Sequence, residues 1–114
     1  MKKAKYYVCP QCRNLLLSTS EAAITCCGRS LEPLAPVKAE ETLRVELVED
    51  ERFITSDHPM TKDHYISFVA FVEGERLTLM KQYPEWDLQV RLPGQCHGVL
   101  LWHCTNHGLF YQLL

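Results

Sequence analysis

Four cysteines near the start of the chain limit what its first part can fold into. Cys9 and Cys12 form a C-x-x-C pair, and Cys26 and Cys27 are adjacent. Residues 1–35 include too few apolar side chains for a hydrophobic core, and so short a segment usually needs a metal, a disulfide or a partner to be stable. Without a secretory signal, this spacing is more typical of a metal site than of disulfides. We therefore predict that the four thiolates bind one iron or zinc ion, and that metal binding supplies much of the folding energy of this module.

The rest of this first segment agrees with a small metal-binding module. Short strands are predicted at 7–8, 15–17 and 23–25, and Gly28 suits a turn that needs a positive φ. A redox-active dithiol of the thioredoxin type is the alternative for the C-x-x-C pair, but the βαβ pattern that accompanies that motif is absent from the sequence.

A domain boundary is predicted near residue 35. Residues 31–41 contain Pro33 and Pro36, which disfavour both a helix interior and a central strand, so we expect an extended linker there. The sequence is thus divided into a metal-binding module at 1–35 and a second domain at 36–114. Beyond the linker, apolar and polar residues alternate with a period of two, and turn residues separate the runs. The predicted strands are 43–48, 52–55, 65–72, 76–83, 86–92 and 99–103. The expected fold class is all-β, with an antiparallel β-sandwich after the metal-binding module.

Composition excludes several classes of function. With 46% hydrophobic and 23% charged residues, the composition is that of a globular protein, and no apolar run is long enough to cross a bilayer. The net charge of −2 lacks the basic excess expected of a nucleic-acid-binding protein. The apolar stretch near the N-terminus is too short for a secretory signal, so we expect a cytoplasmic protein. Neither a phosphate-binding glycine loop nor the nucleophile motif of serine hydrolases is present.

A second candidate metal site combines three histidines and one cysteine. His58 and His64 precede a strong strand pattern, and Cys104 and His107 follow the last predicted strand. Imidazole nitrogens with one thiolate suit iron, zinc or copper rather than magnesium or calcium. Pro59 disfavours a helical conformation at His58, so the six residues that follow can form a loop that returns His64 to the same point. We predict that these four side chains converge on one ion.

These motifs resemble those of a known family. The segment HPMTKDHYI at 58–66 and the segment CTNHG at 104–108 closely resemble the active-site motifs of superoxide reductases. The CPQC segment at 9–12 and the pair at 26–27 resemble the desulforedoxin-like module of the desulfoferrodoxins. The resemblance implies a two-domain iron protein in which an immunoglobulin-like β-sandwich holds the second iron. In that family, four equatorial histidines and one axial cysteine bind this iron, the sixth position is open, and ferrous iron reduces superoxide to hydrogen peroxide by one electron.

The resemblance also implies roles for particular residues. His58, His64 and His107 correspond to equatorial ligands and Cys104 to the axial thiolate. The family's remaining equatorial histidine lies in an upstream Glu-Lys-His segment, but no histidine occurs between Cys27 and His58. The glutamate and lysine that approach the open position in the family are missing with it.

Three hypotheses follow for the second site. It holds iron with three histidines and one cysteine, completed by water or by a substitute such as His97, His103, Glu40 or Glu41. It holds zinc instead, because three nitrogens and one sulfur suffice for a closed tetrahedral site. Or it binds metal poorly and is only part of a folded domain. On strand geometry, His103 faces away from Cys104, which disfavours it as a ligand of the same ion.

The functional prediction has two alternatives. The first is a superoxide reductase that contains iron at both sites, takes electrons from a redox protein such as rubredoxin, passes them on by electron transport through the four-cysteine site, and is a homodimer. The second is a non-catalytic metalloprotein, either an electron carrier or a zinc-stabilised module. Lys62 lies between two predicted ligands, where its charge could attract anionic superoxide, although a solvated loop lysine is the simpler interpretation. Cys96 and His97 fall in a predicted turn and are interpreted as incidental.

Overall fold

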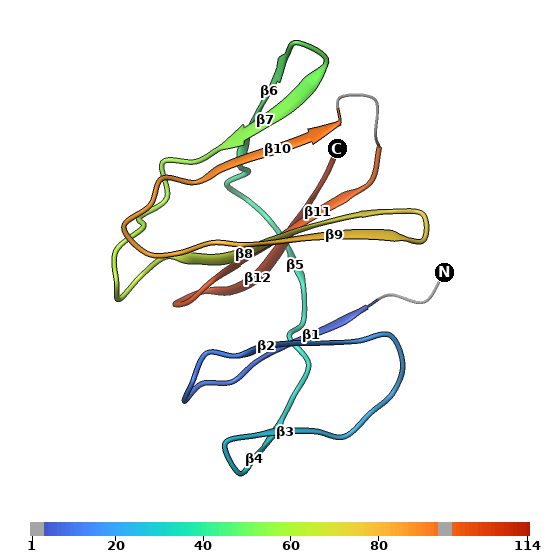
Figure 1. Cartoon of the computed structure of the whole chain (residues 1–114), viewed down its shortest axis with the longest axis vertical. Coiled ribbons are helices and arrows are strands. Elements are labelled where there is room, and N and C mark those ends of the chain that lie inside the picture. The colour runs from blue at the N-terminus through green and yellow to red at the C-terminus, as the bar shows by residue number, and fades with distance from the viewer. Residues whose placement is uncertain (1–3, 94–96) are drawn as a thin grey trace. The chain divides into compact units, whose positions relative to one another are not determined.

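The computed structural model describes residues 4–93 and 97–114, and every regular element in these ranges is a β-strand (Figure 1). The chain divides into two compact units, Met1–Ala35 and Pro36–Leu114. Within the described ranges, no helix is long and apolar enough to cross a membrane. The predicted all-β class is confirmed, and each unit is described below by itself.

The first unit consists of two antiparallel hairpins. Strand β1 (Lys5–Val8) pairs with β2 (Leu15–Ser18), and β3 (Ile24–Cys26) pairs with β4 (Arg29–Leu31). Between β3 and β4, Cys27 and Gly28 have φ angles of 53° and 73°. Two consecutive positive φ angles are typical of the tight hairpin turn whose twist matches that of the flanking strands. The turn expected at Gly28 is therefore present, and it includes one of the four cysteines.

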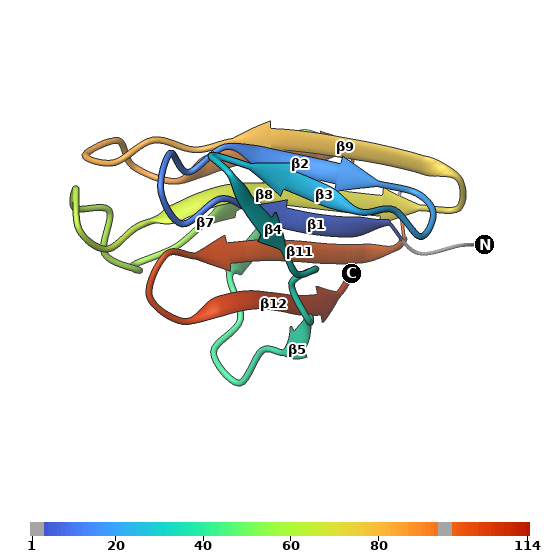
Figure 2. The same cartoon turned by 90° about the horizontal axis from the view of Figure 1, so that it is seen from below.

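The second unit is a sandwich of two sheets. Strands β6 (Arg44–Val48), β7 (Glu51–Thr55) and β10 (Gln89–Pro93) form a three-stranded antiparallel sheet in the order β10-β7-β6. The five-stranded sheet has the order β5-β12-β11-β8-β9, and Figure 2 shows these five strands side by side. Its members are β5 (Val37–Lys38), β8 (Ile66–Glu73), β9 (Arg76–Lys81), β11 (Val99–Cys104) and β12 (Gly108–Leu113).

Two strands of the larger sheet were not predicted. Strand β12 follows the motif at 104–108 and pairs antiparallel with β11 along its whole length. Strand β5 lies in the predicted linker and pairs in parallel with β12 through only two residues. So short a strand has no periodicity of its own, and it forms because β12 provides an edge for it to bind. As a result, the chain just after the domain boundary lies against the sheet.

The hydrophobic core lies between the two sheets of the second unit. Alternate residues of each strand point inward, as the period-two pattern predicts. The buried cluster comprises Leu43, Ile54, Ile66, Val69, Phe71, Leu88, Val90, Leu92, Leu100 and Trp102. Half-buried apolar residues, including Ala39 and Phe110, pack against it. Because Trp102 is two residues before Cys104 on β11, the core extends to the end of the sheet that includes Cys104.

Candidate metal centres

The four predicted cysteine ligands of the first unit come together. The Sγ atoms of Cys9, Cys12, Cys26 and Cys27 all lie within 4.8 Å of one another. Cys9 is fully buried, and its backbone N–H donates to the carbonyl oxygen of Asn14 at 3.0 Å, which closes the loop around the C-x-x-C pair. The second pair is brought to the same place by the hairpin between β3 and β4. Two turns therefore position the four sulfur atoms.

The electrostatics of this cluster favour a bound cation. Hydrogen bonds from the backbone of Cys12 and Gln11 lower the pKa of the Cys9 thiol to about 6. The neighbouring sulfur atoms of Cys12 and Cys9 raise the pKa of the Cys27 thiol to about 12, and the pKa of Cys26 is raised chiefly by Cys12. One thiolate thus forms readily while its neighbours resist ionisation, because adjacent negative charges repel one another. A divalent cation would remove that repulsion, and a set of four thiolates fits iron or zinc.

The three histidines and one cysteine of the second unit also converge. The nitrogen and sulfur atoms that His58, His64, Cys104 and His107 offer all lie within 4.8 Å of one another. The Nε2 atom of His64 is 3.1 Å from the Sγ of Cys104, and the Nδ1 atom of His107 is 3.2 Å from the same sulfur. Donor atoms that bind one ion at about 2.0–2.3 Å lie at most about 4.6 Å apart. The observed bound of 4.8 Å is close to this limit, so the four side chains are placed to bind a single ion.

A short loop with internal hydrogen bonds positions the first two histidines. The backbone N–H of His58 donates to Ser56 Oγ at 3.0 Å, and the imidazole Nδ1–H donates to the carbonyl oxygen of Pro59 at 2.7 Å. This second bond leaves Nε2 of His58 as the nitrogen available to a metal. Thr61 and His64 exchange backbone hydrogen bonds of 3.0 and 3.2 Å across a tight turn, which returns His64 toward His58. Their imidazole rings are 4.7 Å apart between centroids.

The turn between β11 and β12 supplies the other two donors. Cys104 is the last residue of β11 and is fully buried, whereas His107 is exposed in the three-residue loop that follows. Gly108, paired with Cys104, has a φ of +98°, a conformation that side chains rarely adopt. The backbone N–H of Thr105 donates to the carbonyl oxygen of Tyr65 at 3.0 Å, so this turn is tied to the end of the histidine loop. The two motifs are thus held together by backbone contacts.

The charge state of the histidines favours metal binding. Burial lowers the pKa of His64, and nearby His58 and His107 lower it further. A neutral imidazole is the form that binds a metal, so the arrangement favours the form with a free lone pair. The residues present fit a borderline-soft ion of the iron or zinc type.

A hollow of about 650 Å³ lies over the second site. Its walls include His58, His64 and His107 themselves, together with Pro59 and the aromatic rings of Trp102 and Phe110. The segment from Val37 to Glu41 forms another part of the wall. The sequence suggested only Glu40 and Glu41 as residues near this site, because the position of the whole segment depends on the pairing of β5 with β12. His107 is exposed to solvent at this hollow, so the site is accessible from outside the protein.

The suggested substitute ligands lie at different distances from the site. His103 faces away from Cys104 on β11, where its Nδ1 is 2.6 Å from Ser67 Oγ and its ring stacks on Phe68. His97 precedes β11 and is seven residues from Cys104, which is about 23 Å for an extended chain. Glu40 and Glu41 line the hollow, but within the described residues the four-donor group includes neither of them. The sequence expectation that His103 points away agrees with its position.

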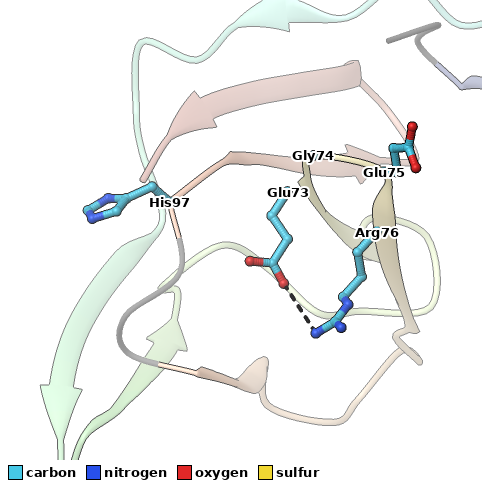
Figure 3. A pocket seen from close by; sticks show the side chains of 5 residues that line it. All are labelled: Glu73, Gly74, Glu75, Arg76 and His97. Atoms are coloured by element: carbon cyan, nitrogen blue, oxygen red, sulfur yellow. Dashed lines mark ion pairs between the residues drawn. The ribbon is translucent and has the colours of Figure 1, made fainter.

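The remaining predicted residues lie outside the hollow. Lys62 is exposed at the tip of the turn between Thr61 and His64 and is not among the described residues that line the hollow. Cys96 lies outside the described residues. Figure 3 shows a second, wide hollow at the turn between β8 and β9, where Glu73 and Arg76 form an ion pair at 3.8 Å and His97 points away from them.

Comparisons with known proteins agree with this fold. No family model matches the chain. A desulfoferrodoxin of Clostridium acetobutylicum is 30% identical over 54 residues, which are 47% of this chain and 43% of the relative, so the chain spans less than half the length of that relative. The superoxide reductase of Treponema pallidum superposes with a TM-score of 0.80 at 16% identity, covering 98% of this chain and 99% of that one. The fold is therefore that of a superoxide reductase, and the predicted resemblance to the desulfoferrodoxin and superoxide reductase family is confirmed.

Proposed function

Because the chain has the fold of a superoxide reductase and resembles a desulfoferrodoxin in sequence, we propose that it is an iron protein that reduces superoxide to hydrogen peroxide. The reaction takes place at the site formed by His58, His64, Cys104 and His107. The observation that carries this proposal is the convergence of these four donors within 4.8 Å beneath an open hollow. A redox-active ion bound there would be accessible to a small substrate.

In this proposal, the buried and the exposed side chains of the site have different roles. When bound, iron supplies one electron to superoxide, which takes up two protons and leaves as hydrogen peroxide. Cys104 is fully buried, so its thiolate lies on the side of the core and donates electron density where water does not reach it. His58 is fixed by the hydrogen bond from its Nδ1–H to Pro59, which keeps Nε2 directed to the ion. The exposed His107 and the hollow form the side from which superoxide enters.

The four-cysteine site has a supporting role in this proposal. Iron bound by four thiolates can pass single electrons between oxidation states, so the first unit would accept electrons from a donor such as rubredoxin. The same ion would hold the first unit together, because this unit has little apolar material of its own. Assembly as a homodimer and a cytoplasmic location belong to the same proposal.

A second candidate is a non-catalytic protein with zinc at the second site. The observation in its favour is that four side-chain donors converge there, which is the number that a closed structural zinc site uses. The two candidates differ in whether the metal can change its oxidation state.

Metal analysis and visible spectroscopy of natively purified protein would separate the candidates. The superoxide reductase predicts iron at the second site and a thiolate-to-iron charge-transfer band that bleaches on reduction and returns when superoxide is added. Cys104→Ser should remove this band and leave the absorption of the four-cysteine site in place. A Cys12→Ser, Cys26→Ser double variant should do the reverse.

The decisive measurement is the rate of superoxide decay with reduced protein, with dioxygen and hydrogen peroxide measured as products. Stoichiometric hydrogen peroxide without dioxygen supports the reductase. Zinc at the second site, or a charge-transfer band that superoxide does not change, would refute it and favour the second candidate.

A further inference from the structure

Among the described residues, one wall of the hollow over the second site, the segment from Val37 to Glu41, adds no donor to the four-atom group, although the exposed Glu40 and Glu41 line it. Val37 pairs with Phe110 in the parallel contact between β5 and β12, and Phe110 in turn pairs with Trp102 on β11. Side chains of paired residues lie on the same face of a sheet, and residues two apart in a strand share a face. Ala39, two residues after Val37, therefore belongs to the same face as Trp102 and Cys104.

Contacts around Ala39 agree with this placement. Its backbone N–H donates to the carbonyl oxygen of Tyr111 at 2.9 Å, which extends the β5–β12 pairing by one residue. Ala39 is half-buried, packs against the core cluster that includes Trp102, and lines the hollow together with His58, His64 and His107. A methyl group thus occupies a position from which a longer side chain would extend into the hollow.

The four donors leave room around a six-coordinate ion. Iron sites with few protein ligands keep open positions for external ligands, and here four of six would be filled by the chain, leaving two. An additional donor beside Ala39 would still leave one position for superoxide.

The walls of the hollow indicate which kind of external donor fits. Trp102 and Phe110, whose ring centroids are 4.8 Å apart, provide aromatic surface beside the histidines. Flat heteroaromatic rings pack favourably on such surfaces. The charged residues that line the hollow are Lys38, Glu40 and Glu41, one positive and two negative, a balance that disfavours a second anion as a resident ligand.

We propose that the hollow beside Ala39 binds a small, neutral nitrogen heterocycle of the imidazole class, whose ring nitrogen binds the metal held by His58, His64, Cys104 and His107. The ligand supplies a nitrogen donor beside Ala39, whose own side chain is only a methyl group. This inference rests on the proposed function only in that it requires a metal ion at the second site.

The test uses the full-length protein loaded with cobalt(II), whose visible bands weaken when the number of ligands rises above four. Imidazole added at millimolar concentration should give a saturable decrease of these bands, and azide at the same concentration should give a smaller change. The Cys12→Ser, Cys26→Ser variant should keep the response, since the second site produces it. Absence of a response, or a larger response to azide, would overturn the proposal.

Two substitutions at one position provide matched controls. Ala39→His should give, without added ligand, a spectrum like that of the imidazole-saturated protein, and should no longer respond to imidazole. Ala39→Leu fills the same space without a donor, so it should keep the four-ligand spectrum and bind imidazole at least about tenfold more weakly. If Ala39→Leu binds imidazole as well as the unchanged protein does, the ligand does not occupy this hollow and the proposal is wrong.

Two further outcomes are distinguishable. If the spectrum without imidazole depends on protein concentration, a histidine of a second copy supplies the donor, which contradicts binding of a free small molecule. If metal analysis finds no cobalt or iron at the second site, the proposed function itself fails. Bound cobalt without an imidazole response refutes only the present inference.

Discussion

Replacement of Gly98 by alanine tests how tightly strand β11 is held at the end opposite the second metal site. A Cβ atom at this position would lie 2.1 Å from the carbonyl oxygen of Val72 and 3.2 Å from Cε1 of Phe71. Real Cβ contacts are essentially never shorter than 3.0 Å, so the backbone must separate by at least 0.9 Å, the difference between 3.0 and 2.1 Å. Gly98 cannot simply move away, because its backbone exchanges hydrogen bonds of 2.9 and 3.4 Å with Leu114 on the other side.

The loss of stability caused by Gly98→Ala can be worked out from this geometry. Forcing extra atoms into a closely packed region typically costs about 1–3 kcal/mol, and displacement of Gly98 also weakens backbone hydrogen bonds worth about 1 kcal/mol each. We therefore expect Gly98→Ala to lower the free energy of unfolding by about 2–4 kcal/mol. In a unit of this size, each kcal/mol corresponds to a change in Tm of about 4–8 °C.

Thermal unfolding followed by tryptophan fluorescence measures this effect in the second unit, which includes both tryptophans. Gly74→Ala is the matched control, because it makes the same change in the unfolded chain and a Cβ there meets no atom within 4 Å. Its φ of +57° makes alanine unfavourable by about 1–2 kcal/mol. The steric explanation is wrong if Gly98→Ala unfolds at the same temperature as the unchanged protein or above the temperature of Gly74→Ala.

Three other perturbations have expected outcomes. Raising the pH from about 7 to about 8 should increase the metal affinity of the first site at least about 100-fold. The reason is that the raised pKa values of Cys26 and Cys27 keep both thiols protonated until the metal displaces two protons. Competition with a coloured chelator measures this affinity, and an affinity that does not change with pH would contradict the reasoning. His64→Ala should lower the iron affinity of the second site by more than about 100-fold, because even the loss of a residue that hydrogen-bonds to a metal ligand lowers affinity about 10–100-fold. If the variant retains iron through dialysis against a chelator, His64 is not a ligand. Ile54→Ala, in the core, should lower the free energy of unfolding by about 2–5 kcal/mol. Leu47→Ala, at a side chain that is 70% exposed, should change it by less than about 0.5 kcal/mol. Urea denaturation of both variants measures the difference.

Much of the candidate chemistry could be inferred from short segments of sequence. The spacing of Cys9 and Cys12 and the adjacent pair at Cys26 indicate a metal site because a tight turn alone places such residues together. The histidine motif beginning at His58 and the motif beginning at Cys104 likewise contain their own turns. Local patterns of this kind depend on few distant contacts, so the residue types and their spacing are informative by themselves.

The extent of the larger sheet was harder to infer. Strand β12 alternates only weakly, and β5 consists of two residues whose conformation depends on an edge provided by the far end of the chain. Long-range pairing of this kind leaves no periodic pattern in the sequence. The hollow and the face on which Ala39 lies could therefore not be predicted from the sequence, because both depend on the pairing of β5 with β12.

The sequence by itself determined which side chains can bind metal, the order of most strands and the division near residue 35, because ligand chemistry, alternation and proline positions are properties of neighbouring residues. Only the tertiary structure decided that His64 and Cys104, forty residues apart, lie 3.1 Å from each other, and that Ala39 lines the hollow over them. The physical reason is that strand register, set by cooperative packing of the two sheets, fixes which face each residue presents, and a shift of one residue would turn Ala39 to the opposite face.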